Sequence, residues 1–529
     1  MELNTTNSNA TSIKSSGFDF YRMGAGLLFL LIIMVYMSFN DVNQSQGILL
    51  VVSAMIGGYM AMNIGANDVA NNVGPAVGSQ ALTLAGAIII AVIFESAGAL
   101  IAGGSVVSTI KSGIIDPQLI GDTNTFIWLM MAALLSAALW LNLATYLGAP
   151  VSTTHSIVGG VLGAGIAAGG WNIANWSQMG AIASSWVISP VMGGLIAAGF
   201  LYLIKHQIIY KKDKLSAAKK VVPLLVMLMT WAFSSYLIVK GIKKIIKVDL
   251  PIALMAGFII SAVVYVVVRP MIARAADNLK DSKKSINQLF TVPLIVAAAL
   301  LSFAHGANDV ANAVGPLAAI NEALSVSASA AVDGGIVSKA SIPLWVMIVG
   351  ASGIALGLML YGPKLIKTVG TEITELDKMR AFCIAMAAAI TVIIATQFGL
   401  PVSSTHIAIG AVFGIGFLRE SIKASYDNMV IEIMHHHQDN DPKSVAAVLE
   451  EFREASIDEK SVILKQLKKK SSKAKLSKKE IKQLKKHFNR VLVKRSALYK
   501  IGAAWVITVP ASGLLASLLF FTIRGFMMP

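Results

Sequence analysis

Charged side chains are scarce in this chain of 529 residues. Asp, Glu, Lys and Arg together make up 14% of it, whereas soluble proteins contain about 25%. Because hydrophobic residues make up 55%, the composition excludes an ordinary soluble protein and indicates one that crosses a membrane many times. Cysteine is nearly absent too, and the single Cys383 excludes an internal disulfide bond.

Apolar runs long enough to span a bilayer, on the order of 20 residues each, recur along the chain. They lie near residues 24–39, 48–66, 83–104, 126–147, 179–204, 222–239, 251–268, 288–304, 343–361, 381–398 and 498–522. Two Gly-rich segments, near 151–171 and 401–419, follow Pro150 and Pro401. We expect these to be broken or re-entrant, because irregular backbone in a bilayer survives only where protein or water satisfies it. The prediction is an all-α polytopic membrane protein with about 12 transmembrane segments.

Two rare motifs occur twice, in the same order. The core GANDVAN of "NIGANDVANNVGPAVGS", from Asn63, returns 241 residues later in "HGANDVANAVGPLAA", from His305. Likewise "LGAPVSTTHSIVGGVLGAGI", from Leu147, is echoed by "FGLPVSSTHIAIGAVFGIGF", from Phe398. The repetition indicates an internal duplication. The second copy is longer, and we place its extra residues in a loop, "NEALSVSASAAVDGG", after Ile320.

The distribution of Lys and Arg predicts the orientation of the copies, because cytoplasmic loops are enriched in these residues. The segments 205–220 and 420–497 are basic, whereas "NDVNQSQG" from Asn40 and "WNIANWS" from Trp171 contain no Lys or Arg. The loop after the first "VSTTH" segment is therefore external and the loop after the second is cytoplasmic. The two repeats are thus inverted, a design that places a transporter's substrate site near the bilayer midplane. Four lysines that would be external do not fit this orientation: Lys240, Lys243, Lys244 and Lys247.

This orientation predicts a multi-pass protein of the cell membrane, whose C-terminus is external. The expected parts are an N-terminal cytoplasmic tail (1–23), a first transmembrane repeat (24–204), a linking region with two transmembrane helices (205–287), a second transmembrane repeat (288–419), a basic helical cytoplasmic insert (420–497) and a C-terminal transmembrane helix (498–529). The span from Lys460 to Lys500 holds 16 Lys or Arg and one acid, so it carries most of the net charge of +16. We interpret it as a solvated loop or one attracted to anionic lipid, not as a nucleic-acid site.

Each GANDVAN motif offers one carboxylate, Asp68 or Asp309, flanked by two Asn residues. A carboxylate at membrane depth is costly and indicates function. Carboxylate and amide oxygens suit an alkali or alkaline-earth cation, whereas the three successive hydroxyls of each "PVS(T/S)TH" segment suit an oxyanion at a helix start. A broken helix presents both kinds of end to its ligands.

Fixed positive charge is missing around both motifs. No Lys or Arg occurs from Met23 to Ile110, Ser112 to Ile204, Ser285 to Ser338, or Ala381 to Leu418. An anion bound near Asp68 and Asp309 without arginines would be repelled by several kcal/mol at ~4 to 6 Å in a low-dielectric site. We therefore expect a cation to bind together with the anion.

Simpler explanations compete at several positions. The Gly residues could serve close helix packing, and the Asn residues could form interhelical hydrogen bonds, but this does not explain the two Asp residues. The hydroxyls of residues 152–154 could cap a helix, which does not exclude a binding role. Glu95 aligns with Gly350 of the second half and is either a third acid of the pathway or a satisfied glutamate. His155 and His406 adjoin hydroxyls, but residues adjacent on one segment are not arranged as nucleophile and base, so we expect no enzyme.

At these motifs the sequence resembles the inorganic phosphate transporter (PiT) family, whose hallmark is the duplicated GANDVAN signature. The resemblance covers both halves and includes "STIKSGIID" from Ser108. It implies symport of inorganic phosphate with sodium ions, or with protons, through an inverted-repeat fold with re-entrant hairpins. The implied phosphate ligands are Asn67, Asp68, Ser152, Thr153, Thr154, Asn308, Asp309, Ser403, Ser404 and Thr405. The implied sodium ligands are Asn67, Asp68, Asn71, Thr154, Asn308, Asp309, Asn312 and Thr405.

The expected partners are thus inorganic phosphate, sodium or protons, and the lipid bilayer, with no resident cofactor and no nucleic acid. A homodimer is the candidate protein assembly. The alternatives are a symporter of another oxyanion such as sulfate, a carrier of a metal–phosphate complex, and a channel or membrane enzyme. A protonated phosphate can donate hydrogen bonds to Asp68 and Asp309, which sulfate cannot, so the acidic site favours phosphate.

Overall fold

The computed structural model describes residues 8–40, 44–147, 151–241, 248–329, 342–372, 376–419, 449–451 and 495–528. These residues are almost wholly helical, and among them there is no β-strand beyond an isolated bridge between Ile115 and Ala174. Eleven helical stretches of the described part are long and apolar enough to cross a membrane. The predicted all-α polytopic membrane fold is confirmed.

The helices of the first half follow the predicted apolar segments closely. They are α1 (Ser8–Asn40), α2 (Gln44–Asn67), α3 (Val69–Gly78), α4 (Leu84–Ala102), α5 (Gly104–Ser112), α6 (Thr123–Leu147), α7 (Thr153–Gly169) and α8 (Trp176–Ile204). Two long helices, α9 (Lys214–Lys240) and α10 (Leu250–Asp277), then pack against each other as a pair. Of the four lysines that do not fit the predicted orientation, Lys240 ends α9, and the other three lie outside the described residues.

The second half repeats the order of the first after the short helix α11 (Lys283–Leu289). Its helices are α12 (Thr291–Asp309), α13 (Ala311–Ser329), α14 (Leu344–Glu372), α15 (Lys378–Gln397) and the unlabelled helix Ser404–Arg419, followed after the insert by α20 (Arg495–Met527). The loop expected after Ile320 is helical as far as Ser329, because α13 continues through it. Its remainder lies outside the described residues.

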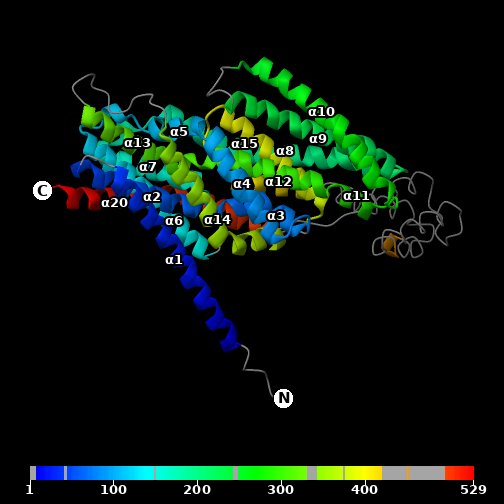
Figure 1. Cartoon of the computed structure of the whole chain (residues 1–529), viewed down its shortest axis with the longest axis horizontal. Coiled ribbons are helices and arrows are strands. Elements are labelled where there is room, and N and C mark those ends of the chain that lie inside the picture. Colours follow the sequence, from blue (N-terminus) through cyan, green and yellow to red (C-terminus); the bar gives the residue numbers. More distant parts are fainter. Residues whose placement is uncertain are drawn as a thin grey trace, which may run out of the picture. The chain divides into compact units, whose positions relative to one another are not determined.

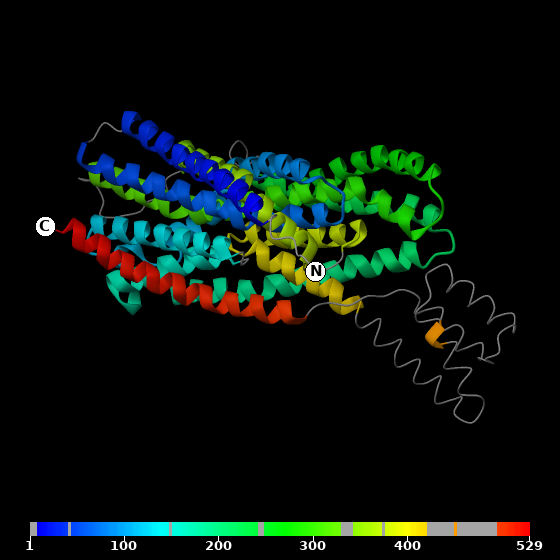
Figure 2. The same ribbon diagram turned by 90° about the horizontal axis from the view of Figure 1, so that it is seen from below.

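The chain forms two compact units, one of Met1–Val412 with Arg495–Pro529 and one of Phe413–Lys494. Within the first unit, α2 packs against α14 and α4 against α12, so each pair joins a helix of one half to a helix of the other (Figure 1). Helix α20 runs beside α7 (Figure 2). Of the second unit, the structure describes 413–419 and 449–451, and the predicted basic insert lies almost wholly outside the described residues.

Four glycines allow this packing between the halves. A Cβ at Gly65 of α2 would meet the backbone carbonyl of Ile354 in α14, and a Cβ at Gly306 of α12 would meet that of Glu95 in α4. Two further glycines make the reciprocal contacts: Gly98 against Phe303 and Gly357 against Met62. Because the helices touch through their backbones, any side chain at these positions would force them apart.

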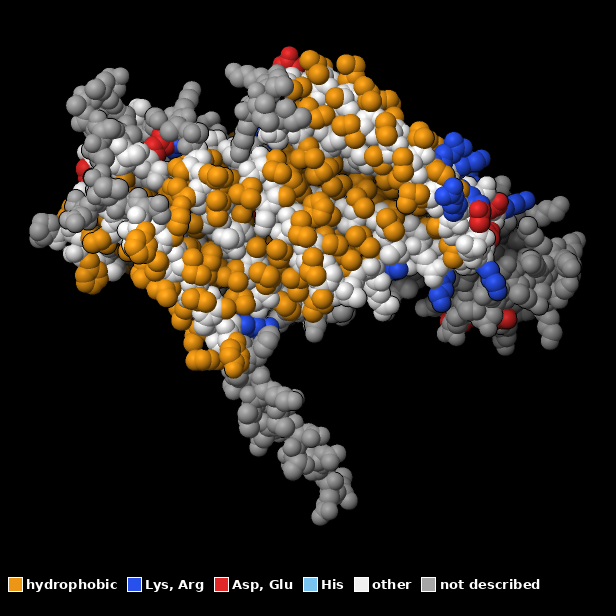
Figure 3. Space-filling view, viewed as in Figure 1, with side chains coloured by type: hydrophobic (Ala, Val, Ile, Leu, Met, Phe, Trp, Pro, Cys, Tyr) orange, Lys and Arg blue, Asp and Glu red, His pale blue; other side chains and the backbone are white. Residues whose placement is uncertain are grey.

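The outer surface of the helices agrees with a membrane environment. Figure 3 shows hydrophobic side chains over most of the visible face, with Lys and Arg gathered at one end near α9, α10 and α11. Exposed large hydrophobic residues lie on α1, α8 and α10, for example Leu28, Leu195 and Val266. Such a broad apolar surface would be unfavourable in water and is the expected face toward lipid.

Candidate functional site

Each GANDVAN motif breaks a helix at its acidic residue. Helix α2 ends at Asn67, α3 begins at Val69, and Asp68 lies between them as the N-cap of α3. In the second copy α12 ends at Asp309 and α13 begins at Ala311. Each interruption is one residue long: Asp68 and Val310 keep helical backbone angles, and backbone hydrogen bonds such as Asp68 N–H to the Ile64 carbonyl continue across them. The interruptions place both carboxylates in the middle of long buried helical stretches.

The two Ser/Thr segments each begin a buried helix. Ser152 caps α7 by accepting a hydrogen bond from the backbone N–H of His155 at 3.1 Å, and Ser403 caps the Ser404–Arg419 helix by accepting one from His406 at 3.3 Å. The predicted capping role therefore applies to the first hydroxyl of each segment. The next two hydroxyls of each segment lie in the first helical turn, and all of them are buried.

The last Asn of each GANDVAN motif forms a hydrogen bond with a Thr in the Ser/Thr segment of the opposite half. The Asn71 amide of the first motif donates to the Thr405 hydroxyl of the second half at 2.8 Å. The Asn312 amide of the second motif donates to Thr154 of the first half at 3.2 Å. These four residues were predicted as cation ligands, and the structure brings them together, although sequence reasoning did not foresee that the pairing crosses between the halves.

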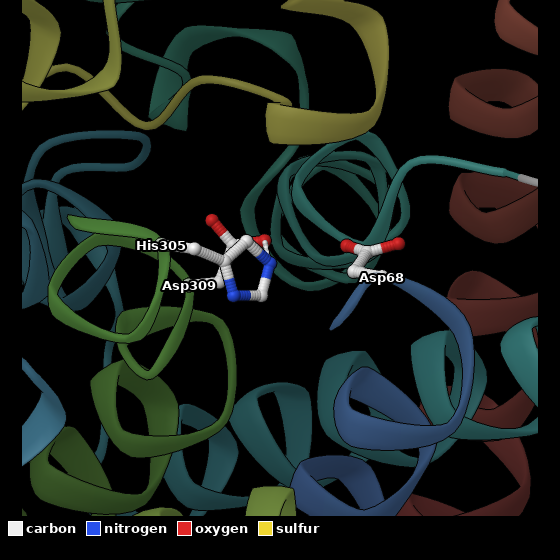
Figure 4. A group of neighbouring side chains, drawn as sticks. All are labelled: Asp68, His305 and Asp309. Atoms are coloured by element: carbon white, nitrogen blue, oxygen red, sulfur yellow. Dashed lines mark ion pairs between the residues drawn. The ribbon is translucent and has the colours of Figure 1, made fainter. Parts of the chain in front are cut away.

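Both carboxylates reach one hydroxyl group. Thr153 Oγ lies 2.6 Å from Asp68 Oδ2 and 3.3 Å from Asp309 Oδ2, while Thr405 donates to Asp68 Oδ1 at 3.2 Å. A hydroxyl has a single proton, so Thr153 donates to Asp68, at the shorter distance, and its bond to Asp309 is the weaker alternative. Asp68 and Asp309 are thus neighbours in one buried site (Figure 4).

The first Asn of each motif positions the broken helix. Asn67 donates to Thr145 of α6 at 3.0 Å, and Asn308 donates to Thr396 of α15 at 2.9 Å. Asn308 also accepts a hydrogen bond from the backbone N–H of Val402 at 3.4 Å. Both Asn residues were predicted as ligands, and the structure shows that their amide N–H groups hold neighbouring helices.

A buried polar chain, missed by sequence reasoning, adjoins Asp309. His305 Nδ1 lies 2.6 Å from the Glu95 carboxylate, and His305 Nε2 lies 3.1 Å from the Asp309 carboxylate. Asn72 donates to the other oxygen of Glu95 at 2.7 Å. The signal that could have found His305 is the contrast between "HGAND" and "IGAND", since the position before the first motif is occupied by Ile64.

The number of protons in this chain follows from its geometry. A neutral imidazole has one N–H, and an ionised carboxylate has none, so His305 alone can donate to only one of Glu95 and Asp309. In the structure Nδ1 makes the hydrogen bond to Glu95, whereas Nε2 makes none, although it lies 3.1 Å from the Asp309 carboxylate. One more proton on the imidazole would let Nε2 donate to Asp309 as well. The chain therefore has a place for a proton within hydrogen-bond distance of the central carboxylates.

The packing corrects the expected alignment of Glu95. Gly306 approaches the backbone of Glu95, and its counterpart Gly65 approaches the backbone of Ile354. The residue that takes the place of Glu95 in the second half is therefore Ile354, one helical turn beyond the expected Gly350. Glu95 was a candidate pathway acid, and the structure places it in the chain through His305 to the central site.

Several buried polar atoms of the site have no hydrogen-bond partner among the described residues. Among them are Asp309 Oδ1, Asn312 Oδ1, Ser404 Oγ and His305 Nε2. Buried polar atoms are nearly always satisfied, so these are the atoms that a bound ion would contact. Asp68, His305 and Asp309 also offer ligand atoms that lie within 4.8 Å of one another. This set of oxygen-rich groups, with one imidazole, fits a cation.

Apolar helices around a pair of buried carboxylates, each at an interruption in a long helical stretch, define a multi-pass membrane protein with a polar site in its interior. The comparisons with known proteins agree. The model of the Phosphate transporter family matches residues 64–516. The chain therefore belongs to the phosphate transporter family, a class of transporters and not of enzymes.

Individual relatives are similar over most of their length. A protein of Helicobacter pylori strain J99, provisionally named phosphate permease, is 54% identical over 95% of this chain and 95% of its own. One from Pyrococcus furiosus with the same provisional name is 37% identical over 73% of this chain and 91% of its own. A solved structure described as the sodium-dependent phosphate transporter is 29% identical, has a TM-score of 0.71, and covers 91% of this chain and 100% of that one.

Proposed function

We propose that this protein carries inorganic phosphate across the membrane by symport with a cation, with sodium as the favoured ion. The observation that carries the proposal is the meeting of Asp68 and Asp309 in one buried site, together with unpartnered polar atoms of the same residues and their neighbours. Membership of the phosphate transporter family and the similarity to a transporter described as sodium-dependent support it.

Electrostatics explains why the two cargoes would travel together. A negative charge about 5 Å from a carboxylate is repelled by roughly 3 kcal/mol even at an effective dielectric constant of about 20. Two carboxylates double this cost, and the described residues place no Lys or Arg beside them. One sodium ion bound to Asp68 and Asp309 halves the negative charge and weakens the repulsion, and a second cation would cancel it, so that the anion can bind.

The proposed roles divide the site by chemistry. Sodium would bind the oxygens of Asp68 and Asp309 together with those of nearby amides and hydroxyls, since hard cations prefer oxygen ligands. The remaining proposed sodium ligands are Asn67, Asn71, Thr154, Asn308, Asn312 and Thr405. Phosphate would accept hydrogen bonds from hydroxyls at the two helix starts, of which the unpartnered Ser404 is the clearest donor. A protonated phosphate could also donate to Asp309 Oδ1.

The proton is the second candidate for the coupling ion. It is favoured by the chain from Glu95 through His305 to Asp309, which has room for one proton more than ordinary ionisation provides. A proton held there would reduce the negative charge near phosphate, as sodium would. The two ions are distinguishable because sodium replacement by potassium leaves a proton gradient intact.

Phosphate uptake into proteoliposomes tests the proposal. We expect an imposed sodium gradient, inside low, to drive accumulation of radiolabelled phosphate, and potassium to fail as a replacement. Accumulation driven by a pH gradient without sodium would assign the proton instead. Sulfate accumulation in the absence of phosphate uptake would reject phosphate as the substrate.

Calorimetry with the purified protein tests the charge argument directly. Sodium and phosphate should each raise the affinity for the other by the same factor, about 5- to 150-fold for couplings of typical size. A titration of phosphate at several sodium concentrations, with ionic strength held constant, measures this factor. Phosphate affinity that is independent of sodium and of pH would contradict the proposed compensation of charge.

The location in the cell membrane, with the N-terminus and the 420–497 insert cytoplasmic and the C-terminus external, remains part of the proposal. So does the inversion of the repeats. The external position of the C-terminus can be tested with a cysteine introduced at Met528, which is exposed. A membrane-impermeant reagent added to intact cells should label this cysteine. The native Cys383 is buried and should not react.

A further inference from the structure

The segment 399–402 leads directly into the Ser/Thr segment of the second half. Helix α15 ends just before it, where Gly399 has a φ of 67°, a left-handed conformation that glycine adopts at little cost. Pro401 disfavours a helical conformation of the residue before it. The backbone therefore stays non-helical until the next helix begins at Ser404. The position of this segment decides where the hydroxyls that follow it lie.

Every carbonyl of the segment accepts a hydrogen bond from a side chain of another helix. Non-helical backbone at membrane depth needs such partners, because lipid offers none. The four bonds are Thr109 of α5 to Gly399 at 2.7 Å, Asn308 of α12 to Leu400 at 3.3 Å, Trp186 of α8 to Pro401 at 3.2 Å, and Thr154 of α7 to Val402 at 3.0 Å. Three of these donors belong to the first half, which thus fixes a segment of the second.

We propose that Trp186 and Thr109 are positioning residues for phosphate. They hold the segment 399–402, and through it they place the hydroxyls of the second Ser/Thr segment, of which Ser404 is the clearest phosphate donor. The proposal rests on the proposed function. Neither residue belongs to the GANDVAN motifs or to the Ser/Thr segments.

Trp186 contacts the beginnings of both Ser/Thr helices. Its ring packs against that of His155, with the centroids 3.9 Å apart and an interplanar angle of 42°. His155 directly follows Thr154 in the first turn of α7. The indole N–H of the same side chain holds Pro401, two residues before Ser403. One side chain thus sets the spacing between the helix starts of the two halves.

The two motif histidines extend this contact. The rings of His155 and His406 meet edge to face, with their centroids 4.4 Å apart, and both side chains are buried. Aromatic rings at this separation attract each other in this orientation. The histidines that adjoin the hydroxyls therefore form, with Trp186, a packed aromatic cluster where the two helix starts meet.

The tryptophan occurs in both copies of the repeat. The sequence "WVIS" from Trp186 returns as "WVIT" from Trp505. The packing matches the two positions, because Gly410 approaches the carbonyl of Pro190 and its counterpart Gly159 approaches that of Val509. Trp186 thus belongs to the frame that the two halves share.

Loss of one of these hydrogen bonds should act on the affinity for phosphate and spare the maximal rate. In the parent protein the segment 399–402 is held in place before phosphate arrives. Without one bond the segment leaves this position for part of the time, and the apparent affinity falls with the fraction of protein that is still arranged for binding. Bound phosphate restores the arrangement, so transport at saturation is kept.

Phosphate uptake kinetics in proteoliposomes test the positioning role. Trp186→Phe keeps the ring and removes the N–H, and Thr109→Val keeps the shape and removes the hydroxyl. Each should raise the KM for phosphate about 5-fold, the effect of one lost hydrogen bond, with a maximal rate within about 2-fold of the parent. Thr109→Ser keeps the hydroxyl and should keep the KM of the parent. The Thr109 variants keep the test available if Trp186→Phe folds poorly.

The matched control is Trp231→Phe. Trp231 Nε1 donates to the backbone carbonyl of Leu254 at 2.9 Å and so joins α9 to α10 by the same kind of bond. This variant should lower the temperature of thermal unfolding about as much as Trp186→Phe and leave the KM unchanged. Equal rises of the KM in the two variants would show that lost stability is the cause and would overturn the proposal.

The remaining outcomes separate this proposal from the proposed function. If the parent protein transports phosphate and both Trp186→Phe and Thr109→Val keep its KM, the positioning role is rejected and the proposed function stands. A fall of the maximal rate with an unchanged KM also rejects it, because the two residues would then serve the conformational cycle. A parent that takes up no phosphate under any gradient rejects the proposed function itself, and the positioning role with it.

Discussion

In the first copy of the GANDVAN motif, the residue one turn before the aspartate is Ile64, and in the second copy it is His305. Around Ile64 the neighbouring helix offers Ile354, whereas around His305 the equivalent helix offers Glu95. The remaining member of the polar chain, Asn72, corresponds to Ala313 in the second motif. The residues next to Asp68 at these positions are therefore apolar, whereas those next to Asp309 form a chain of polar groups.

The contacts that the copies share are the ones that build the site. Each motif anchors its first Asn to a Thr of a later helix in the same half, α6 or α15, and extends its last Asn to a Thr of the opposite half. The two copies thus share one frame of hydrogen bonds, and the chain from Asn72 through Glu95 to His305 has no counterpart in the other copy. We infer that the contacts shared by the two copies build the binding site. The contacts found in only one copy give phosphate and the coupling cation different surroundings.

The largest expected effect comes from the carboxylates themselves. Asp68→Asn and Asp309→Asn should each reduce cation-driven uptake at least about 100-fold, a loss of ~3 kcal/mol, because an essential cation ligand is removed. Asp309→Asn should be the more severe, since His305 loses its second carboxylate neighbour as well. Initial uptake rates in proteoliposomes, with thermal unfolding to confirm the fold, check the order. Near-normal uptake in both variants would contradict a role for either carboxylate.

Removal of the polar chain tests the asymmetry. Glu95→Gln should lower uptake about 10-fold, because it weakens the charge-assisted contact with His305, which is worth roughly 1.5 kcal/mol. Its matched control at the equivalent position, Ile354→Leu, should stay within about 2-fold, since conservative apolar changes are tolerated. Equal losses in the two variants would show that the position matters for packing alone and not for its charge.

The two hydrogen-bonded pairs that join the halves, Asn71–Thr405 and Asn312–Thr154, should respond alike when the Asn is replaced. Asn71→Ala and Asn312→Ala each remove a buried amide that holds a hydroxyl of the opposite half, so the affinity for the coupling cation should fall about 5-fold in each, the effect of ~1 kcal/mol. Sodium titration of uptake at saturating phosphate measures this. A change in only one of the two would mean that the copies do not share the cation site.

The smallest effect is expected where the first Asn of each motif is anchored. Thr145→Val and Thr396→Val each remove one acceptor and keep the shape of the side chain, which should lower the free energy of unfolding by about 1 kcal/mol. Thermal unfolding in detergent should show similar shifts for both. A shift confined to Thr396→Val would mean that water from a cavity lined by Thr145 replaces the lost hydroxyl.

Much of this molecule was predictable because its strongest signals are local. Apolar length gave the spans, and Gly and Pro marked the helices that begin at residues 153 and 404. The motif aspartates were predicted to share a site, and the structure places them together. The pairing of each last Asn with the opposite half, His305 and Trp186 were not found, because each depends on which helices become neighbours across the halves, and spacing within one copy carries no information about that.

The glycine contacts between α2 and α14, and between α4 and α12, have a consequence for the origin of the chain. Each half leaves a bare stretch of backbone that only the other half covers, so neither repeat is a folding unit alone. A half-length ancestor with the same glycines could have covered that backbone only by pairing with a second copy of itself. The present chain is then a fused dimer, and fusion is what allowed its two subunits to become chemically different.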